Sequence, residues 1–159
     1  MLKLTNEQRN AIQAQGERGY PEEVCGFLIG TAEGDNKTVT TLREIENTWD
    51  EDGAPEFAAA GDAFAGASRR RRFKIPPDEY LAADREARAA GTAILGFYHS
   101  HPDHPARPSE HDLALAREIF PGYSYIIVAI RQARAADMTS WVLRDDYSQF
   151  DAEDLTTDA

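Results

Sequence analysis

Three short apolar runs, each eight residues long, limit the ways in which this chain can fold. They are VCGFLIGT (24–31), TAILGFYH (92–99) and YSYIIVAI (123–130). Runs of this length are typical of strands that lie inside a sheet. Residues 37–48 are rich in β-branched side chains, and together with residues 138–144 they are predicted to add two further strands.

Three helical segments are predicted between these strands, at residues 5–18, 77–90 and 109–119. Thr5 and Gln8 form a capping-box pattern at the start of the first, and Pro77 suits the first turn of the second. Residues 100–108 contain three prolines and are expected to form a loop. The order of segments predicts an α/β domain with one mixed central sheet flanked by helices.

The length of 159 residues suits a single domain. We expect this domain to span residues 1–145, with an insertion at about residues 50–68 that is rich in alanine, glycine and acidic residues. The insertion is either a mobile loop or a flap that contacts the substrate. Residues 146–159 are expected to form an acidic C-terminal tail whose end is frayed.

Charge and composition exclude several classes of protein. A net charge of −11 argues against general nucleic-acid binding, which needs a basic face. Four consecutive arginines at 69–72 are the local exception, either as a solvated loop or as a docking patch for an acidic partner. No apolar run approaches the roughly 18 residues that cross a membrane. With a polar N-terminus and a single cysteine, Cys25, the chain is expected to be cytoplasmic.

The residues with the clearest chemistry lie in GFYHSHPDHPARPSEHD, residues 96–112. His99 and His101 are two apart at the end of a predicted strand, so their side chains point to the same face. Ser109 is placed to cap the following helix, and Asp112 falls in its first turn, where a carboxylate is favoured. Two imidazoles and one carboxylate form a usual catalytic zinc set that leaves a fourth position for water.

The spacing His-Ser-His, seven residues, Ser, two residues, Asp resembles the motif of the JAMM, or MPN+, zinc metalloprotease family. That motif also includes a glutamate just before an apolar strand with an early glycine. The segment EVCGFLIG (23–30) is similar to it, with Glu23 three residues before Gly26 and Glu22 as the alternative. The resemblance covers residues 21–143, and HSHPDHPARPSEHD is similar to the compact bacterial branch of the family.

The resemblance implies a single MPN (JAB1-like) domain with a layering similar to that of cytidine deaminases. It implies one zinc ion per chain, held by His99, His101 and Asp112. Glu23 would be the general base, and the Ser109 hydroxyl would stabilise the oxyanion. Ser109 has a purely structural alternative, since Ser-x-x-Asp is also a helix cap.

The activity implied is hydrolysis of the bond after the C-terminal Gly-Gly of a small ubiquitin-like or sulfur-carrier protein. One alternative is a deconjugating isopeptidase of a bacterial ubiquitin-like tagging system. Another is a non-catalytic MPN scaffold, although all five motif residues are present. A zinc deaminase is excluded, because its Pro-Cys-x-x-Cys needs two cysteines. The oligomeric state is left open.

Several single residues carry expectations of their own. Ser100 is predicted to point away from the zinc face and to buttress the loop. His104 and His111 are predicted to face solvent. Cys25 is expected to be a small buried hydrophobe, and Trp141, like Trp49, is expected to serve in packing.

Overall fold

The computed structural model describes residues 1–45, 76–118 and 122–158. The predicted insertion, the four arginines at 69–72 and Trp49 lie outside these ranges. The described residues form β1 (Leu2–Thr5), α1 (Asn6–Gly19), β2 (Cys25–Glu33), β3 (Asn36–Ile45), α2 (Pro77–Ala89), β4 (Ala93–Pro102), α3 (Glu110–Arg117), β5 (Ser124–Arg131), β6 (Arg134–Leu143), β7 (Phe150–Glu153) and β8 (Leu155–Asp158).

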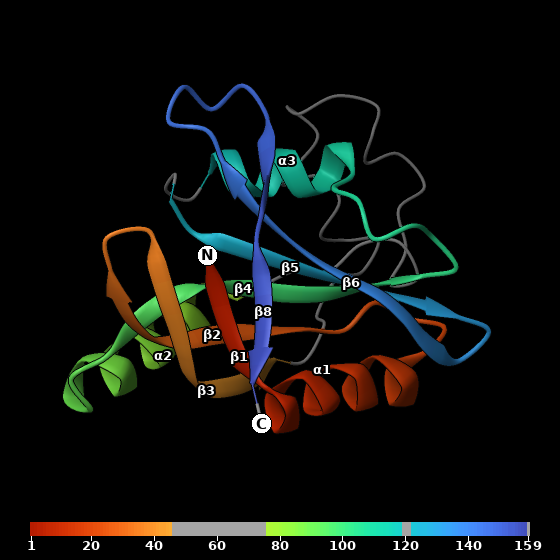
Figure 1. Ribbon diagram of the computed structural model, residues 1–159, viewed down its shortest axis with the longest axis horizontal. Helices are drawn as coiled ribbons and strands as arrows, with labels where there is room; N and C mark the ends of the chain where they lie inside the picture. Colours follow the sequence, from red (N-terminus) through yellow and green to blue (C-terminus); the bar gives the residue numbers. More distant parts are fainter. Residues whose placement is uncertain (46–75, 119–121, 159) are drawn as a thin grey trace.

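All the strands of the described ranges join one eight-stranded sheet in the order β7-β6-β5-β4-β2-β3-β1-β8. The pairs β4–β5, β1–β3 and β1–β8 are parallel, and the other neighbours are antiparallel. The predicted mixed central sheet flanked by helices is therefore confirmed (Figure 1).

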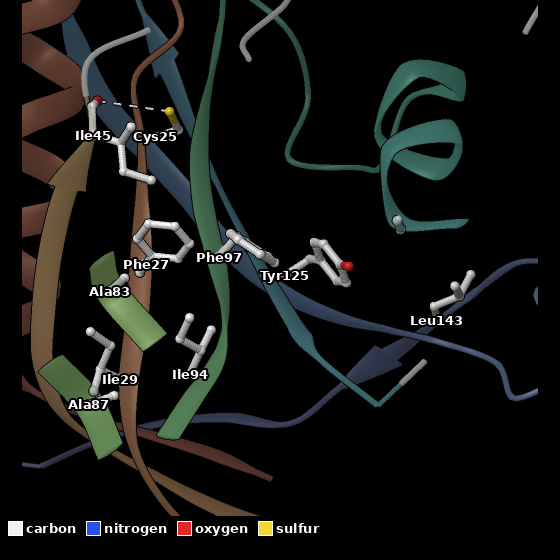
Figure 2. Close-up of a cluster of buried hydrophobic side chains, with 11 residues drawn as sticks. Cys25, Phe27, Ile29, Ile45, Ala83, Ala87, Ile94, Phe97, Tyr125 and Leu143 are labelled. Carbon is white, nitrogen blue, oxygen red and sulfur yellow. Dashed lines mark hydrogen bonds between the residues drawn. The ribbon is translucent and has the colours of Figure 1, made fainter. Parts of the chain in front are cut away.

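The helices cover both faces of the sheet, because successive residues of a strand point to opposite sides. Phe27 and Phe97 pack with alanines of α2 and α3 on one face (Figure 2). Their sequence neighbours Leu28 and Tyr98 pack with Ile12 of α1 on the other face. Two apolar cores thus form, and α1 lies opposite α2 and α3.

The capping box predicted at the start of the first helix is confirmed. The Thr5 side chain accepts a hydrogen bond from the Gln8 N–H, and the Gln8 side chain accepts one from the Thr5 N–H. Gly91 follows α2 with a φ of 73°, a conformation that glycine adopts without strain. No helix in the described part of the chain is long and apolar enough to cross a membrane.

Two predictions about strands were wrong. The loop expected from residue 100 begins only after Pro102, because β4 continues its parallel pairing with β5 as far as Pro102 and Ile130. The end of the tail is not frayed within the described residues: β7 pairs with β6, and β8 pairs with β1. Main-chain hydrogen bonds to existing sheet edges order this acidic segment, whose side chains carry no strong strand signal.

The same segment joins the two edges of the sheet. β7 and β8 stand at opposite ends of the strand order, yet only Asp154 separates them in the sequence. The Leu2 N–H donates to the Asp154 carbonyl at 2.9 Å, so β1 approaches the chain at that connection. The sheet is therefore curled until its edges meet at one continuous extended segment, residues 150–158.

Candidate active site

Two histidines of the site lie near the end of β4. His99 pairs with Cys25 of β2 and with Ile127 of β5, while His101 pairs with Ala129. Because residues i and i+2 share a face, both imidazoles point to the side of α2 and α3. Both are buried, and their Nε2 atoms lie 3.1 Å apart.

Asp112 approaches the two imidazoles from the first turn of α3. One carboxylate oxygen lies 3.0 Å from His99 Nε2, and the other lies 3.1 Å from His101 Nε2. The Ser109 N–H donates to Asp112 Oδ2 at 2.8 Å, and Ser109 Oγ accepts from the Asp112 N–H at 3.1 Å. The start of the helix therefore fixes this carboxylate against both rings.

Glu23 supplies a second buried carboxylate from the segment just before β2. One of its oxygens and one ring nitrogen each of His99 and His101 all lie within 4.8 Å of one another, a grouping that could hold a metal ion. Glu22 is exposed. The structure thus brings Glu23, and not its neighbour, to the histidine pair.

Ser100 holds the Glu23 segment in place from the opposite face of β4. Its buried Oγ accepts a hydrogen bond from the Val24 N–H at 2.9 Å, and its own N–H donates to the Val24 carbonyl at 3.0 Å. Ser100 was predicted to buttress the loop that follows; its hydrogen bonds instead reach the residue next to Glu23. No sequence pattern pointed to this clamp, because it joins residues 76 positions apart.

Burial and contacts within the cluster shift the pKa values of His99 and Asp112. Burial lowers the pKa of His99 below its ordinary value, so the ring is neutral near pH 7. Burial alone would raise the pKa of Asp112, but the facing His99 and His101 imidazoles outweigh it and hold the pKa well below its usual range. A neutral imidazole beside an ionised carboxylate is the protonation state that metal ligands require.

The donor set fits a zinc ion. His101 Nδ1 lies 2.8 Å from the Pro105 carbonyl, which can only accept, so Nδ1 carries a proton and Nε2 is the ring nitrogen that would bind a metal. Four atoms around zinc at tetrahedral bonding distances are about 3.3 Å apart. The separations of 3.0–3.1 Å between the two Nε2 atoms and the Asp112 oxygens approach that value.

The remaining histidines behave differently from each other. His104 is exposed, as predicted, with its ring centroid 6.4 Å from that of His101. His111 was predicted to face solvent, and this was wrong, since only 1% of it is exposed. The first turn of α3 lies against the sheet because Asp112 is drawn to the imidazoles, and the residue before it is buried with it. Cys25 is buried as expected, and burial raises the pKa of its thiol.

The fold and this cluster agree with comparisons to known proteins. A profile for prokaryotic homologs of the JAB domain matches residues 5–144, so the chain belongs to this family. It is 30% identical over 130 residues to a desampylase from Haloferax volcanii, covering 79% of this chain and 78% of that protein. It is 27% identical over 145 residues to a CysO-cysteine peptidase from Mycobacterium tuberculosis, covering 91% of this chain and 84% of the peptidase.

Solved structures lead to the same family fold. A protein from Desulfitobacterium hafniense matches with a TM-score of 0.76 at 28% identity, over 99% of this chain and 92% of that one. A protein from Salinibacter ruber matches with a TM-score of 0.67 at 37% identity, over 99% and 91%. A JAB1/MPN domain protein from Archaeoglobus fulgidus, 16% identical over 99% of this chain and 98% of that one, has a TM-score of 0.56 and supports the fold alone. The expected MPN domain is confirmed.

Proposed function

We propose that this chain is a zinc-dependent peptidase that cleaves after the C-terminal Gly-Gly of a small ubiquitin-like or sulfur-carrier protein. The observation that carries the proposal is the buried convergence of two imidazoles with two carboxylates that come from different elements. Such a set can hold a metal with one carboxylate and move a proton with the other.

His99, His101 and Asp112 would hold the ion, because their ligand atoms already lie at mutual contact distance. When bound, zinc would lower the pKa of a coordinated water to about 7 and polarise the scissile carbonyl. Asp112 suits the ligand role because α3 fixes it rigidly, through the hydrogen bond from the Ser109 N–H.

Glu23 is the proposed general base. One of its buried carboxylate oxygens lies within 4.8 Å of a ring nitrogen of each histidine, close enough to act on a water molecule held at this cluster. It would accept the proton of the attacking water and return it to the leaving amine. Ser109 Oγ uses a lone pair to cap α3. Its own O–H remains able to donate to the oxyanion, so capping and catalysis are compatible.

The substrate class is supported by relatives and by sterics. One relative is named a desampylase and another a CysO-cysteine peptidase, and the second name describes cleavage of a bond to cysteine. Glycine lets a substrate main chain pass close to a metal without a side-chain clash. A deconjugating isopeptidase would use the same residues on a lysine-linked substrate.

The test is a cleavage assay, read by intact mass, on ubiquitin-like proteins that carry C-terminal extensions. We expect cutting after Gly-Gly, a large loss of rate when the junction is Ala-Ala, and loss of activity with a chelator that is restored by zinc. Equal cutting of both junctions would contradict the glycine requirement. Activity that persists after complete metal removal would contradict the zinc mechanism.

A further inference from the structure

A groove lies directly beside the loop that follows β4. Two adjoining hollows of about 540 and 530 Å³ share Pro105 and Arg131 in their walls. The second hollow is also lined by Arg107, Asp137 and Trp141. Arg107 comes from the loop after β4, Arg131 from the end of β5, and the other two from β6.

The groove opens on the same face of the sheet as the histidines. Ile127 pairs with His99 on one side and with Thr139 of β6 on the other, and paired residues point to the same face. Thr139 and, two residues on, Trp141 therefore share the face of the imidazoles and line the groove. Pro105 connects the two sites, because its carbonyl contacts His101 Nδ1 at 2.8 Å.

Three arginines at or beside the groove have no partner among the described residues. In the described part of the chain, the guanidinium groups of Arg85, Arg107, Arg131 and Arg134 make no hydrogen bond or ion pair, whereas the other arginines do. Arg134 pairs with Arg131 across the turn between β5 and β6. Three of these four cations thus lie at or beside the groove, on a chain with a net charge of −11.

The wall that carries Arg107 is held rigidly. Trp141 Nε1 donates to Thr139 Oγ1 at 2.8 Å, and the Thr139 hydroxyl donates to the Ala106 carbonyl at 2.7 Å. Ala106 is itself buried against β5. The main chain beside Arg107 is therefore anchored to the sheet, and Arg107 is an exposed residue that lines the groove together with Trp141.

We propose that this groove binds the free terminal carboxylate of a short extension on the leaving side of the scissile bond, with Arg107 and Arg131 as its partners. The inference rests on the proposed function and narrows its substrate to a linear extension. Only the width of the His101 ring and one hydrogen bond separate the metal-facing nitrogen from the groove wall at Pro105. An extended chain advances roughly 3.3–3.6 Å per residue, so one to about three residues would reach the arginines.

The chemistry needs nothing beyond water. Hydrolysis breaks the C–N bond after Gly-Gly, adds the water's hydroxyl to the glycine carbonyl carbon, and delivers a proton to the leaving nitrogen. The extension departs as a free amino acid or short peptide with its carboxylate unchanged. Guanidinium groups pair with carboxylates through paired N–H donors, which suits this terminal group.

The kinetic test compares two substrates that differ in one group. A ubiquitin-like protein ending in Gly-Gly plus one to three residues is prepared with either a free C-terminal carboxylate or a C-terminal amide. We expect a KM lower by about tenfold for the carboxylate, the size of a charge-assisted hydrogen bond. Arg107→Gln and Arg131→Gln should remove that preference by raising the KM for the carboxylate substrate, whereas Arg85→Gln, at an exposed position of α2, should keep it.

A binding measurement separates this inference from the proposed function. The affinity of the Glu23→Gln variant for the two substrates needs no hydrolysis, and it should show the same preference. If the preference is present but the wild type cleaves neither substrate, the groove assignment holds and the proposed function fails. Equal affinity for carboxylate and amide overturns the groove assignment, whatever the activity.

A substitution of Asp137 is expected to strengthen binding of the carboxylate substrate, the opposite of the effect of the arginine substitutions. It lines the groove, and within the described residues it has no ion-pair partner, so its charge repels a bound carboxylate. Asp137→Asn should tighten binding of the carboxylate substrate and leave the amide unchanged, a gain that loss of structure would not produce. The proposal would be overturned if a lysine-linked protein were cleaved as well as the linear extension and if neither arginine substitution changed that cleavage rate. The groove would then bind a protein joined through lysine.

Discussion

At the scale of single residues, the site contrasts two buried carboxylates. Asp112 is in direct contact with both imidazoles and with the first turn of α3. Glu23 comes from the segment just before β2, which Ser100 holds through Val24, and one of its oxygens lies within 4.8 Å of a nitrogen of each ring. The sequence motif predicted both residues and their proximity to the histidines. Their separate roles stay predictions, which substitutions can distinguish.

Replacing Glu23 with glutamine should abolish proton transfer without emptying the site. The amide has a similar shape but cannot accept the water's proton, so we expect kcat/KM to fall by about 10²–10⁴-fold, the usual size of general-base catalysis. Metal content should stay at one zinc per chain by elemental analysis. Exposed Glu22→Gln is the matched control and should be near wild type. The reverse result would assign the base to Glu22.

Ser109→Gly separates capping from catalysis. Glycine is accepted at a helix N-cap at a cost of only a few tenths of a kcal/mol, so the protein should remain about as stable in urea denaturation. Loss of the hydroxyl donor should lower kcat by about 10²–10³-fold, as for other oxyanion donors. A variant that unfolds more easily but hydrolyses normally would leave Ser109 with the structural role alone.

At the scale of elements, the point at which β4 ends determines where the histidine pair lies. The proline content of residues 100–108 predicted a loop directly after His99, but pairing with β5 extends the strand to Pro102. This extension places His101 within the sheet and lets Ser100 reach Val24 on the other side. Periodicity and proline count reflect local preference, whereas the end of this strand is set by pairing with residues of β5 that lie 28 positions later in the chain.

Ser100→Ala tests the link between β4 and the Glu23 segment. Removing the hydroxyl leaves the Val24 N–H without its acceptor, which should cost about 1–3 kcal/mol in chemical denaturation. Because the freed segment carries Glu23, kcat should fall as well, while the zinc content is retained. Thr41→Ala, an exposed hydroxyl on β3, is the control and should change neither quantity. Normal kcat in Ser100→Ala would show that Glu23 is positioned by other contacts.

At the scale of the whole molecule, the sequence predicted the buried parts better than the edges. The central strands β2, β4 and β5 and the three helices of the described ranges appeared as apolar runs and caps. β1, β7 and β8 were not predicted, because strands of only four residues are too short to show a distinctive pattern, although β1 contributes the buried Leu2 and Leu4. These short strands form because their main chains pair with neighbouring strands, β8 with β1 and β7 with β6.

The segment that joins the sheet edges should contribute measurably to stability. Phe150 and Leu155 are half-buried against the two cores, and burying both side chains incompletely is worth about 2–4 kcal/mol. Deleting residues 150–159 should therefore lower Tm by roughly 5–15 °C, at 2–4 °C per kcal/mol for a chain of this size. An unchanged melting curve would mean that the segment does not hold the edges together in solution.

The burial of Cys25 makes alkylation of its thiol a probe of how often the surrounding strands open. The thiol lies directly beside His99 in the β2–β4 pair, is fully shielded, and has a raised pKa, so alkylating reagents can reach its thiolate only when these strands separate. The rate of labelling, followed by mass spectrometry, therefore measures how often the strands around His99 separate. The proposed zinc ion would bind the closed form, so adding zinc should slow labelling in proportion to its saturation of the site. The binding of zinc can thus be followed without any substrate.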